Sequence, residues 1–530
     1  MKAFKLFLKE NGTLLVVCYV FAIITVILSF YCSIGTKTFY NAILNNNALS
    51  ERGLSLFYLI GAYAVILIAS VWSTILTHRM LYKGLLNIRH GMMYHLLHTP
   101  FQYFSSHNVG QIWSEMVSTT NEVGIFHYSL LMLPIDLTEV IVYGFILFNQ
   151  SVTAGLIICA FIPLIIITTF FSGKRLSRRR GEGLSQFRAV ASWATETLTS
   201  IKMIKTTSSQ DYFLDAFSEK HERMNRTDVK VSVLNTYVDA VQNLIIVIAP
   251  LIVVFLSTRL TSVKDLGTGE LVILYTFTPL FFNAFRSLYA RLYKFFGVKP
   301  ARTSVAAVLS LEGEAFGFIH PEERLQIDVR DFHYRMGDKE IKIPDFSIKP
   351  GDKVLISGES GMGKSTLFNC LTGIHTNFQD TLLLNNRPLK DYDLSELRKK
   401  ILLVSQEPMI FSGTLRDNLF MNLSDSVSEE ALQSCLKLLR LNDLYKRETI
   451  GKDELSGGEK ARINLAQALL RKPECLLIDE TLSSVDEAFE KEIITHIINE
   501  NPDMSVVYIT HRTSVQNMFD RVVRLEGGIR

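Results

Sequence analysis

Six long apolar runs occupy the first 300 residues of this 530-residue chain, and they limit its fold more than any other feature. The runs cover 14–35, 54–76, 125–148, 152–171, 233–257 and 271–296. Each has roughly the 20 residues that an α-helix needs to cross the hydrocarbon core of a bilayer. A single run of this kind could be a buried helix of a large soluble protein. Six of them in one chain predict a membrane domain with six spanning helices.

The basic residues of the loops predict the orientation of the chain. Within the first 300 residues, most lysines and arginines outside the runs lie in the N-terminal tail and in two long connections, 77–124 and 172–232. Because cytoplasmic loops are enriched in Lys and Arg, we expect a multi-pass protein of the cell membrane with both termini in the cytoplasm. Both connections contain apolar residues at helical spacing, at 85–98 and 187–204, so the helices are expected to continue beyond the bilayer.

Charged side chains within membrane spans are costly and usually face a cavity or one another. Asp136 and Glu139 lie in the third run, Asp239 in the fifth and Arg286 in the sixth. At about 1.5 Å per residue, Asp239 and Arg286 have similar depth, and they could form a pair or extend separately to the headgroups. Glu139 lies deeper, and the sequence leaves open whether it lines a substrate cavity or bonds to a neighbouring helix.

The remainder of the chain has the composition of a soluble domain. We expect a membrane domain over 1–300, a linker over 301–325 and a soluble domain over 326–530. The net charge of +3 is too small to indicate a nucleic acid partner. The six cysteines show no metal-ligand or redox spacing, which favours free thiols in a reducing compartment.

The soluble domain contains the phosphate-loop pattern G-x-x-x-x-G-K-[ST] between an apolar strand, 353–357, and a helical stretch, 367–372. Its residues are Gly358, Glu359, Ser360, Gly361, Met362, Gly363, Lys364, Ser365 and Thr366. The glycines allow successive N–H groups to point at phosphate oxygens, and the lysine can reach the outer phosphates. The Ser365 hydroxyl is placed to hold Mg²⁺. The stretch therefore predicts a site for the phosphates of a nucleotide.

Two further apolar strands end in polar side chains. The stretch 473–480 ends in Asp479 and Glu480, and the stretch 506–511 ends in His511. The first acid can hold Mg²⁺ through water, and the second can orient or deprotonate an attacking water. A histidine at a strand end is more often structural, but one that follows two such acids is a candidate for the same site.

A second anion-binding helix start precedes the helical run 461–470. It has the sequence Ser456-Gly457-Gly458-Glu459. The N-terminus of a helix favours anions, but one nucleotide triphosphate does not need two such ends from one subunit. We therefore expect this second helix start to cap the phosphate that another copy of the chain binds.

These motifs, in this order, resemble the nucleotide-binding domain of ABC transporters. The whole chain resembles an ABC half-transporter of the exporter type, in which an α-helical transmembrane bundle precedes an α/β P-loop nucleotide-binding domain. The resemblance covers essentially all of the chain. It implies ATP and Mg²⁺ as ligands, ATP hydrolysis coupled to transport by alternating access, and a homodimer in the lipid bilayer.

The resemblance also implies how the nucleotide is held. Tyr334 would stack on adenine, and residues 358–366 would cradle the phosphates. Residues 456–458 would close over the γ-phosphate of the opposite subunit. The sequence departs from the family pattern at 449–454, which is shorter than usual, and at Glu459, where glutamine is commoner.

Roles in the chemistry follow from the same resemblance. Gln406 would contact Mg²⁺ and water, and Asp479 would be the Mg²⁺ ligand. Glu480 would be the general base, and His511 would contact the γ-phosphate. Residues 483–486 match the loop that communicates across the dimer.

The leading interpretation is an ATP-driven exporter of a small peptide, a drug-like molecule or an amphipathic substrate. A lipid flippase or an importer on the same scaffold is an alternative, and so is a membrane regulator that uses ATP only as a switch. Glu480 and His511 argue against an idle site, because degenerate sites commonly lose such residues. The six runs exclude a soluble ABC ATPase.

Overall fold

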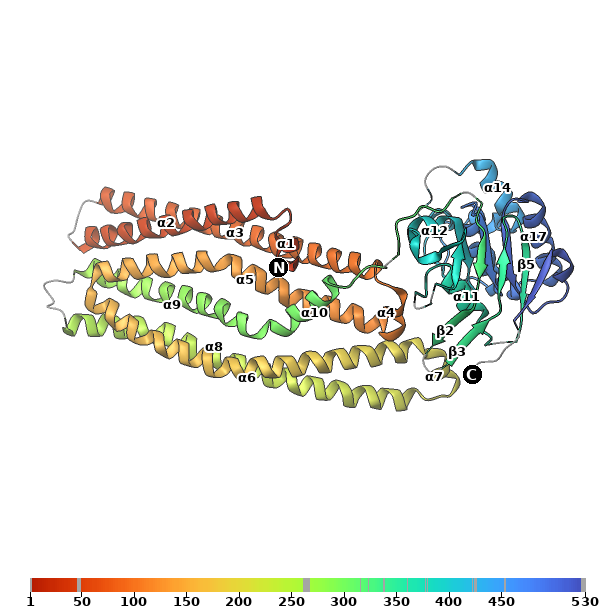
Figure 1. Cartoon of the computed structure of the whole chain (residues 1–530). Helices are drawn as coiled ribbons and strands as arrows, with labels where there is room; N and C mark the ends of the chain where they lie inside the picture. Colours follow the sequence, from red (N-terminus) through yellow and green to blue (C-terminus); the bar gives the residue numbers. More distant parts are fainter. Residues whose placement is uncertain are drawn as a thin grey trace. The chain divides into compact units, whose positions relative to one another are not determined.

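The computed structural model of the chain describes residues 2–44, 49–260, 267–314, 316–322, 324–336, 339–359, 361–376, 378, 380–421, 423, 427–451 and 454–525. It divides into two compact units. The first comprises Met1–His98 and Ser106–Glu312, and the second comprises Thr99–Ser105 and Gly313–Arg530. Figure 1 shows long helices in the first unit and a sheet with helices around it in the second.

The first part of the chain folds into helices of very different lengths. They are α1 (Lys2–Leu8), α2 (Gly12–Leu44), α3 (Leu49–Leu97), α4 (Phe101–Ser106), α5 (Val109–Gln150), α6 (Val152–Thr199), α7 (Ile201–Thr206), α8 (Gln210–Leu260), α9 (Thr268–Gly297) and α10 (Lys299–Leu309). The predicted extension of the helices beyond the apolar runs is therefore observed in α3, α5, α6 and α8.

Among the described residues, five helices are long and apolar enough to cross a membrane. They are Gly12–Leu44, Arg52–Leu97, Val109–Gln150, Gln210–Leu260 and Thr268–Leu292. The remaining predicted run corresponds to a shorter apolar segment of α6, Val152–Thr168. Large side chains such as Phe57, Tyr58 and Leu67 of α3 are mostly exposed, which suits a surface that faces lipid.

The charged residues of the spans pair differently from one expectation. Arg286 of α9 donates to Oδ1 of Asn243 at 2.9 Å rather than to Asp239. Asn243 lies about one turn further along α8 than Asp239, so the register of α9 against α8 selects the amide. Asp136 of α5 forms an ion pair with Arg291 of α9.

The second unit is built on a parallel sheet. The strands are β1 (Ile327–Val329), β2 (Phe332–Met336), β3 (Lys339–Ile343), β4 (Phe346–Ile348), β5 (Lys353–Ser357), β6 (Leu382–Leu384), β7 (Arg387–Pro388), β8 (Ile401–Val404), β9 (Cys475–Asp479), β10 (Ser505–Ile509) and β11 (Arg521–Arg524). The parallel sheet has the order β11-β5-β10-β9-β8, an antiparallel sheet has the order β4-β1-β6-β7, and β2 pairs with β3.

Helices flank the parallel sheet, and its central strands β5, β10 and β9 are buried on both faces. The helices are α11 (Lys364–Leu371), α12 (Leu394–Lys400), α13 (Leu415–Leu419), α14 (Glu429–Leu438), α15 (Asn442–Tyr445), α16 (Gly457–Leu469) and α17 (Glu487–Glu500), with 3₁₀ turns η1 (Leu389–Asp391), η2 (Thr481–Ser484) and η3 (Gln516–Met518). Side chains alternate between two cores along each strand: Leu476 and Ile478 of β9 belong to one, and Cys475 and Leu477 to the other.

The segment Thr99–Ser105 groups with the second unit, where the Gln102 amide donates to the Thr376 hydroxyl at 3.2 Å. All six cysteines are free in the structure.

Candidate nucleotide site

Four neighbouring strands of the parallel sheet carry the predicted site residues at their carboxyl ends. The phosphate loop follows β5, His511 follows β10, Asp479 ends β9 with Glu480 directly after it, and Gln406 follows β8. These strands are adjacent in the order β5-β10-β9-β8. Because the carboxyl ends of parallel strands meet at one edge of a sheet, residues from four distant stretches come together there.

The phosphate loop has the backbone that its glycines allow. Gly361 and Gly363 adopt φ values of 87° and 88°, in the left-handed region. A Cβ at Gly363 would lie 2.3 Å from Cγ2 of Ile341, so this position also has no room for a side chain. Gly363 is the N-cap of α11, whose first turn contains Ser365 and Thr366. Ser360 lies outside the described residues.

Lys364 lies beneath this loop and is only 6 % exposed. Its Nζ donates to the carbonyl oxygens of Gly358 at 2.7 Å and Glu359 at 3.4 Å. The same atom lies 3.5 Å from Nε2 of His511 and 3.9 Å from Oε1 of Glu480. An ammonium group with these partners can exchange them for phosphate oxygens without leaving its place.

Glu480 lies between the other candidate residues. Its Oε1 is 2.9 Å from Nε2 of His511, and its Oε2 accepts from Nε2 of Gln406 at 3.5 Å. Its φ of 48° is in the left-handed region, which is unfavourable for a residue with a side chain. The Glu480 N–H donates to the Ile509 carbonyl at 3.0 Å, which fixes this conformation. The strained residue is thus held with its carboxylate toward His511 and Gln406.

Asp479 has the environment that a divalent cation would need. It is 6 % exposed, and its Oδ1 is buried with no hydrogen-bond partner among the described residues. Burial raises the pKa of Asp479, while a hydrogen bond from Ser365 acts in the opposite direction. A buried carboxylate oxygen without a partner, next to a serine hydroxyl, fits the oxygen ligands that Mg²⁺ prefers.

The second helix start is built as a capping box at the beginning of α16. Ser456 is the N-cap, and its hydroxyl and backbone N–H donate to Oε2 of Glu459 at 2.7 and 2.8 Å. Gly457 and Gly458 lie against η2: a Cβ at Gly458 would be 3.1 Å from the Ser484 carbonyl oxygen. Ser456 and Gly457 are exposed, so the N-terminus of α16 is open to solvent.

Tyr334 occupies a different environment from the other candidates. It lies on β2 and is 6 % exposed, as part of the core that contains Phe332 and Ile341. Its ring centroid is 5.3 Å from that of His375. Its role toward adenine stays a prediction.

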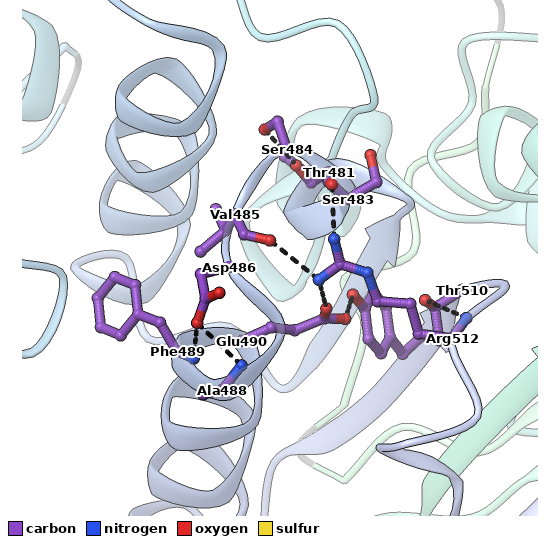
Figure 2. A network of polar contacts seen from close by, with 11 residues as sticks. Thr481, Ser483, Ser484, Val485, Asp486, Ala488, Phe489, Glu490, Thr510 and Arg512 are labelled. Atoms are coloured by element: carbon purple, nitrogen blue, oxygen red, sulfur yellow. Dashed lines mark hydrogen bonds and ion pairs between the residues drawn. The ribbon is translucent and has the colours of Figure 1, made fainter.

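Arg512 is a residue of this region that the motifs did not single out. As Figure 2 shows, its guanidinium donates to the carbonyl oxygens of Ser483 at 2.7 Å and Val485 at 2.9 Å. It also forms an ion pair with Glu490, which is completely buried, and the Tyr508 hydroxyl donates to the same carboxylate. Arg512 therefore ties the loop 483–486 to the strand end that carries His511.

A signal for this network was present in the sequence. Glu490 stands on α17 between Phe489 and Ile493, both of which are buried. A charged residue on the apolar face of a helix requires a partner, and Arg512 is next to His511. Asp486 begins α17 as its N-cap and accepts from the N–H groups of Ala488 and Phe489.

The fold and the site together define a membrane protein with an α/β domain that binds nucleotide phosphates. Comparison with known proteins names this class. The model of the ABC transporter transmembrane region matches residues 15–285, and that of the ABC transporter domain matches residues 341–483. The chain belongs to the ABC transporter family.

Individual relatives agree with this assignment. The chain is 24 % identical over 540 residues to the "Lactococcin transport/processing ATP-binding protein LcnC-like" of Lactococcus lactis, which covers 97 % of this chain and 73 % of that protein. It is 24 % identical over 537 residues to the "ATP-dependent lipid A-core flippase" of Psychrobacter arcticus, which covers 96 % and 89 %.

A solved structure has the same fold. The structure of a bacterial Atm1-family ABC exporter with ATP bound matches with a TM-score of 0.82 and 17 % identity, and the match covers 97 % of this chain and 94 % of that one. The predicted fold class, a transmembrane helix bundle followed by an α/β nucleotide-binding domain, is confirmed. The chain is an ATP-binding, ATP-hydrolysing transporter of the exporter type that crosses the membrane several times.

Proposed function

We propose that two copies of the chain form a homodimer that exports a small peptide or amphipathic substrate by hydrolysing MgATP at two shared sites. The main support is the exposure of the second anion-binding helix start, at Ser456 and Gly457. Lys364 and the phosphate loop lie at the edge of the parallel sheet, whereas Gly457 and Gly458 lie against Ser484. A second copy is needed to bring an exposed Ser456 to a nucleotide held by Lys364.

The nucleotide is held by residues from several elements. Residues 358–366, which include Lys364, surround the phosphates, and Tyr334 contacts the base. Ser365 and Asp479, with Gln406 nearby, would hold Mg²⁺, which neutralises the charge that develops on the phosphates. The unpaired Oδ1 of Asp479 supports this assignment.

The hydrolytic step uses the cluster around Glu480. When ATP enters, Lys364 exchanges its loop carbonyl partners for phosphate oxygens, and His511 moves from Glu480 to the γ-phosphate. Glu480 then accepts a proton from a water whose oxygen attacks the γ-phosphorus, and the bond from that phosphorus to ADP breaks. The left-handed backbone of Glu480 supports this role because it directs the carboxylate at the site.

The class of substrate follows from the relatives and from one membrane residue. One relative is named for the transport of lactococcin, and another for flipping the lipid A core. The first of these cargoes is a peptide, and the second is an amphipathic lipid. In α5, Asp136 is neutralised by Arg291, while Glu139 is half-buried. Of the two acids Asp136 and Glu139, it is therefore Glu139 that would meet a cationic group of the substrate.

The domain boundaries and the orientation are part of the same proposal. We place the membrane domain at 1–300, the linker at 301–325 and the nucleotide-binding domain at 326–530. Both termini lie in the cytoplasm, because the N-terminal tail and the long connections are rich in lysine and arginine.

The test uses the purified full chain in liposomes, with the wild type and Glu480→Gln compared side by side. Wild-type liposomes should hydrolyse ATP only with Mg²⁺ and should accumulate a fluorescent cationic peptide through molecules whose ATP site faces outward. Glu480→Gln should keep the affinity for a labelled ATP analogue and lose about 10²–10⁴-fold in turnover, as expected for loss of a general base. Unchanged turnover would remove Glu480 from its role. Hydrolysis without peptide uptake, but with movement of a labelled lipid between leaflets, would replace the exporter of peptides by a flippase.

A further inference from the structure

A cavity of about 1070 Å³ lies in the first unit, among α1, α5 and α10. Phe4 of α1, Phe126 and Leu130 of α5 and Ala306 of α10 give it apolar walls. Its size is at the upper end of ordinary small-molecule sites. No residue of the proposed nucleotide site lines this cavity, and Glu139 does not line it either.

The charge of the cavity has one sign. Lys2, Lys299 and Arg302 line it, and its lining includes no aspartate or glutamate. Within the described residues, none of these three cations takes part in an ion pair. Lys2 donates to the Leu309 carbonyl at 3.1 Å, and the Arg302 guanidinium lies 5.3 Å from the centre of the Phe126 ring. The cavity therefore presents cationic groups that no acid neutralises.

His127 provides a second and independent sign of a ligand. It lines the cavity and is only 5 % exposed, and its Nδ1 is buried with no hydrogen-bond partner among the described residues. Its ring lies 5.2 Å from that of Phe4 and 5.4 Å from that of Phe126, centre to centre. A buried polar atom without a partner costs free energy, which a ligand oxygen would recover.

The position of the cavity indicates the kind of anion. His127 and Leu130 are at the start of the apolar run 125–148, and Lys2 belongs to the basic N-terminal tail. The cavity thus lies where apolar chain gives way to basic chain, as at a membrane–water boundary. A ligand of this cavity would contact both its cationic groups and its apolar walls. An anionic lipid has both kinds of group, whereas a small soluble ion has only the charge.

We propose that this cavity binds an anionic phospholipid from the leaflet on the side of the N-terminus. The phosphate is held by Lys299, Arg302 and His127, and the acyl chains lie along Phe4, Phe126 and Leu130. The lipid would connect α1 and α10 to α5 and would stabilise the end of the first unit. This site is separate from the proposed nucleotide and substrate sites.

The test measures lipid bound to the purified full chain by native mass spectrometry. The protein is offered phosphatidylglycerol or phosphatidylcholine of the same acyl chains, and inorganic phosphate is added as a competitor. Wild type should retain phosphatidylglycerol at least about tenfold better than phosphatidylcholine, since charge-assisted contacts to phosphate are at stake. The variant Lys299→Gln/Arg302→Gln should lose this preference. Both residues are exposed at the surface of α10, so the helix core is unchanged.

The matched control is Lys202→Gln/Lys205→Gln, which removes the same charge from exposed positions of α7 outside the cavity. It should bind phosphatidylglycerol as the wild type does. The single variants Lys299→Gln and His127→Leu should each show an intermediate loss, and a thermal scan checks that each remains folded. The proposal is overturned if wild type holds both lipids equally, or if the control loses as much preference as the cavity variant. It is also overturned if millimolar inorganic phosphate displaces the lipid completely, since the site would then be one for a free anion.

Discussion

A single buried carboxylate determines how the end of β10 is connected to the loop after β9. Glu490 is completely buried, and a charge in such a place is tolerated only when it is paired and hydrogen-bonded. Arg512 supplies the opposite charge and the Tyr508 hydroxyl supplies a hydrogen bond. The pKa of Tyr508 is raised mainly by burial and also by the neighbouring carboxylate of Glu490. The Tyr508 hydroxyl therefore keeps its proton and can donate it in a hydrogen bond to Glu490. The remaining donors of Arg512 hold the carbonyl groups of Ser483 and Val485.

Arg512→Gln should destabilise the protein strongly, because it leaves the carboxylate of Glu490 buried without a counter-charge. Breaking one side of a buried pair typically costs about 3–5 kcal/mol. Tyr508→Phe should cost less, about 1.5–3 kcal/mol, since it removes one hydrogen bond to a charged group. Thermal unfolding of the purified chain measures the order of the variants. The double variant Arg512→Gln/Glu490→Gln is the control, compared with Arg512→Gln and Glu490→Gln alone. It should lose less stability than the two single variants lose together, and strict additivity of the losses would show that the pair does not act as a unit.

At the scale of whole elements, the sequence predicts the polar residues that follow the strands better than it predicts where one strand stops and the next begins. The phosphate loop, Asp479, Glu480 and His511 could be found because each follows a short apolar run, and the parallel sheet then places such ends together. The stretch 327–334 has the apolar pattern of a single strand, but it forms two, β1 and β2, in different sheets. The break lies at Asp331, whose φ is 45° and whose N–H donates to Asp345 at 2.7 Å. The apolar pattern alone gives no sign of a left-handed aspartate.

Other features of the site depend on contacts that no sequence pattern contains. The left-handed backbone of Glu480 is fixed by the Ile509 carbonyl of a neighbouring strand. The choice of Asn243 rather than Asp239 as the partner of Arg286 depends on the register between two helices. In both cases the packing of distant segments, and not the local sequence, determines the geometry.

The capping box of α16 gives a prediction at this scale. Burial raises the pKa of Glu459, but hydrogen bonds from the N–H and hydroxyl of Ser456 outweigh it and lower the pKa overall. A carboxyl whose pKa is lowered in the folded state stabilises the fold above its ordinary pKa, and this contribution is lost as the pH falls through the lowered value. Glu459→Gln keeps a side chain that can accept from Ser456, whereas Glu459→Ala does not.

We therefore expect Glu459→Ala to destabilise the chain by about 1 kcal/mol at pH 7 and Glu459→Gln by less. The difference in melting temperature between wild type and Glu459→Gln should shrink as the pH is lowered from 7 to 4, because only the wild-type side chain becomes protonated. Thermal unfolding at several pH values measures this. A constant difference between the two proteins across that range would mean that the Glu459 charge does not contribute.

At the scale of the whole molecule, the chain holds half of what the proposed reaction needs. It supplies one phosphate loop, at the start of α11, and one helix start at Ser456, at the start of α16. It also carries a full set of candidate residues: Tyr334, Lys364, Gln406, Ser456, Asp479, Glu480 and His511. Nothing in this set requires a partner chain of different sequence. Two identical copies related by a two-fold axis would pair each phosphate loop with the Ser456 of the other copy and make two equivalent sites.

This arrangement predicts that two inactive variants restore activity when they are combined. Lys364→Ala removes the ammonium that reaches the phosphates, and Ser456→Arg blocks the helix start that closes the site of the other copy. Each variant alone should be inactive, because both sites of its homodimer carry one lesion. A dimer of one Lys364→Ala chain and one Ser456→Arg chain has both lesions in one site and leaves the other intact. When the chains are made together, half of the random dimers are mixed, so independent sites should return about a quarter of wild-type ATPase activity.

Two different affinity tags, one on each variant, allow the mixed dimers to be purified before their ATPase activity is measured. The control pools the two variants after separate purification, without exchange of chains, and should show no recovery. A Lys364→Ala chain combined with a differently tagged Lys364→Ala chain should also stay inactive, because every site then lacks the ammonium. If purified mixed dimers of the two variants show no ATPase activity, either the two sites must act together or each site belongs to one chain. Nucleotide binding separates these cases, since a shared but obligatorily paired site would still trap one labelled ATP analogue per mixed dimer.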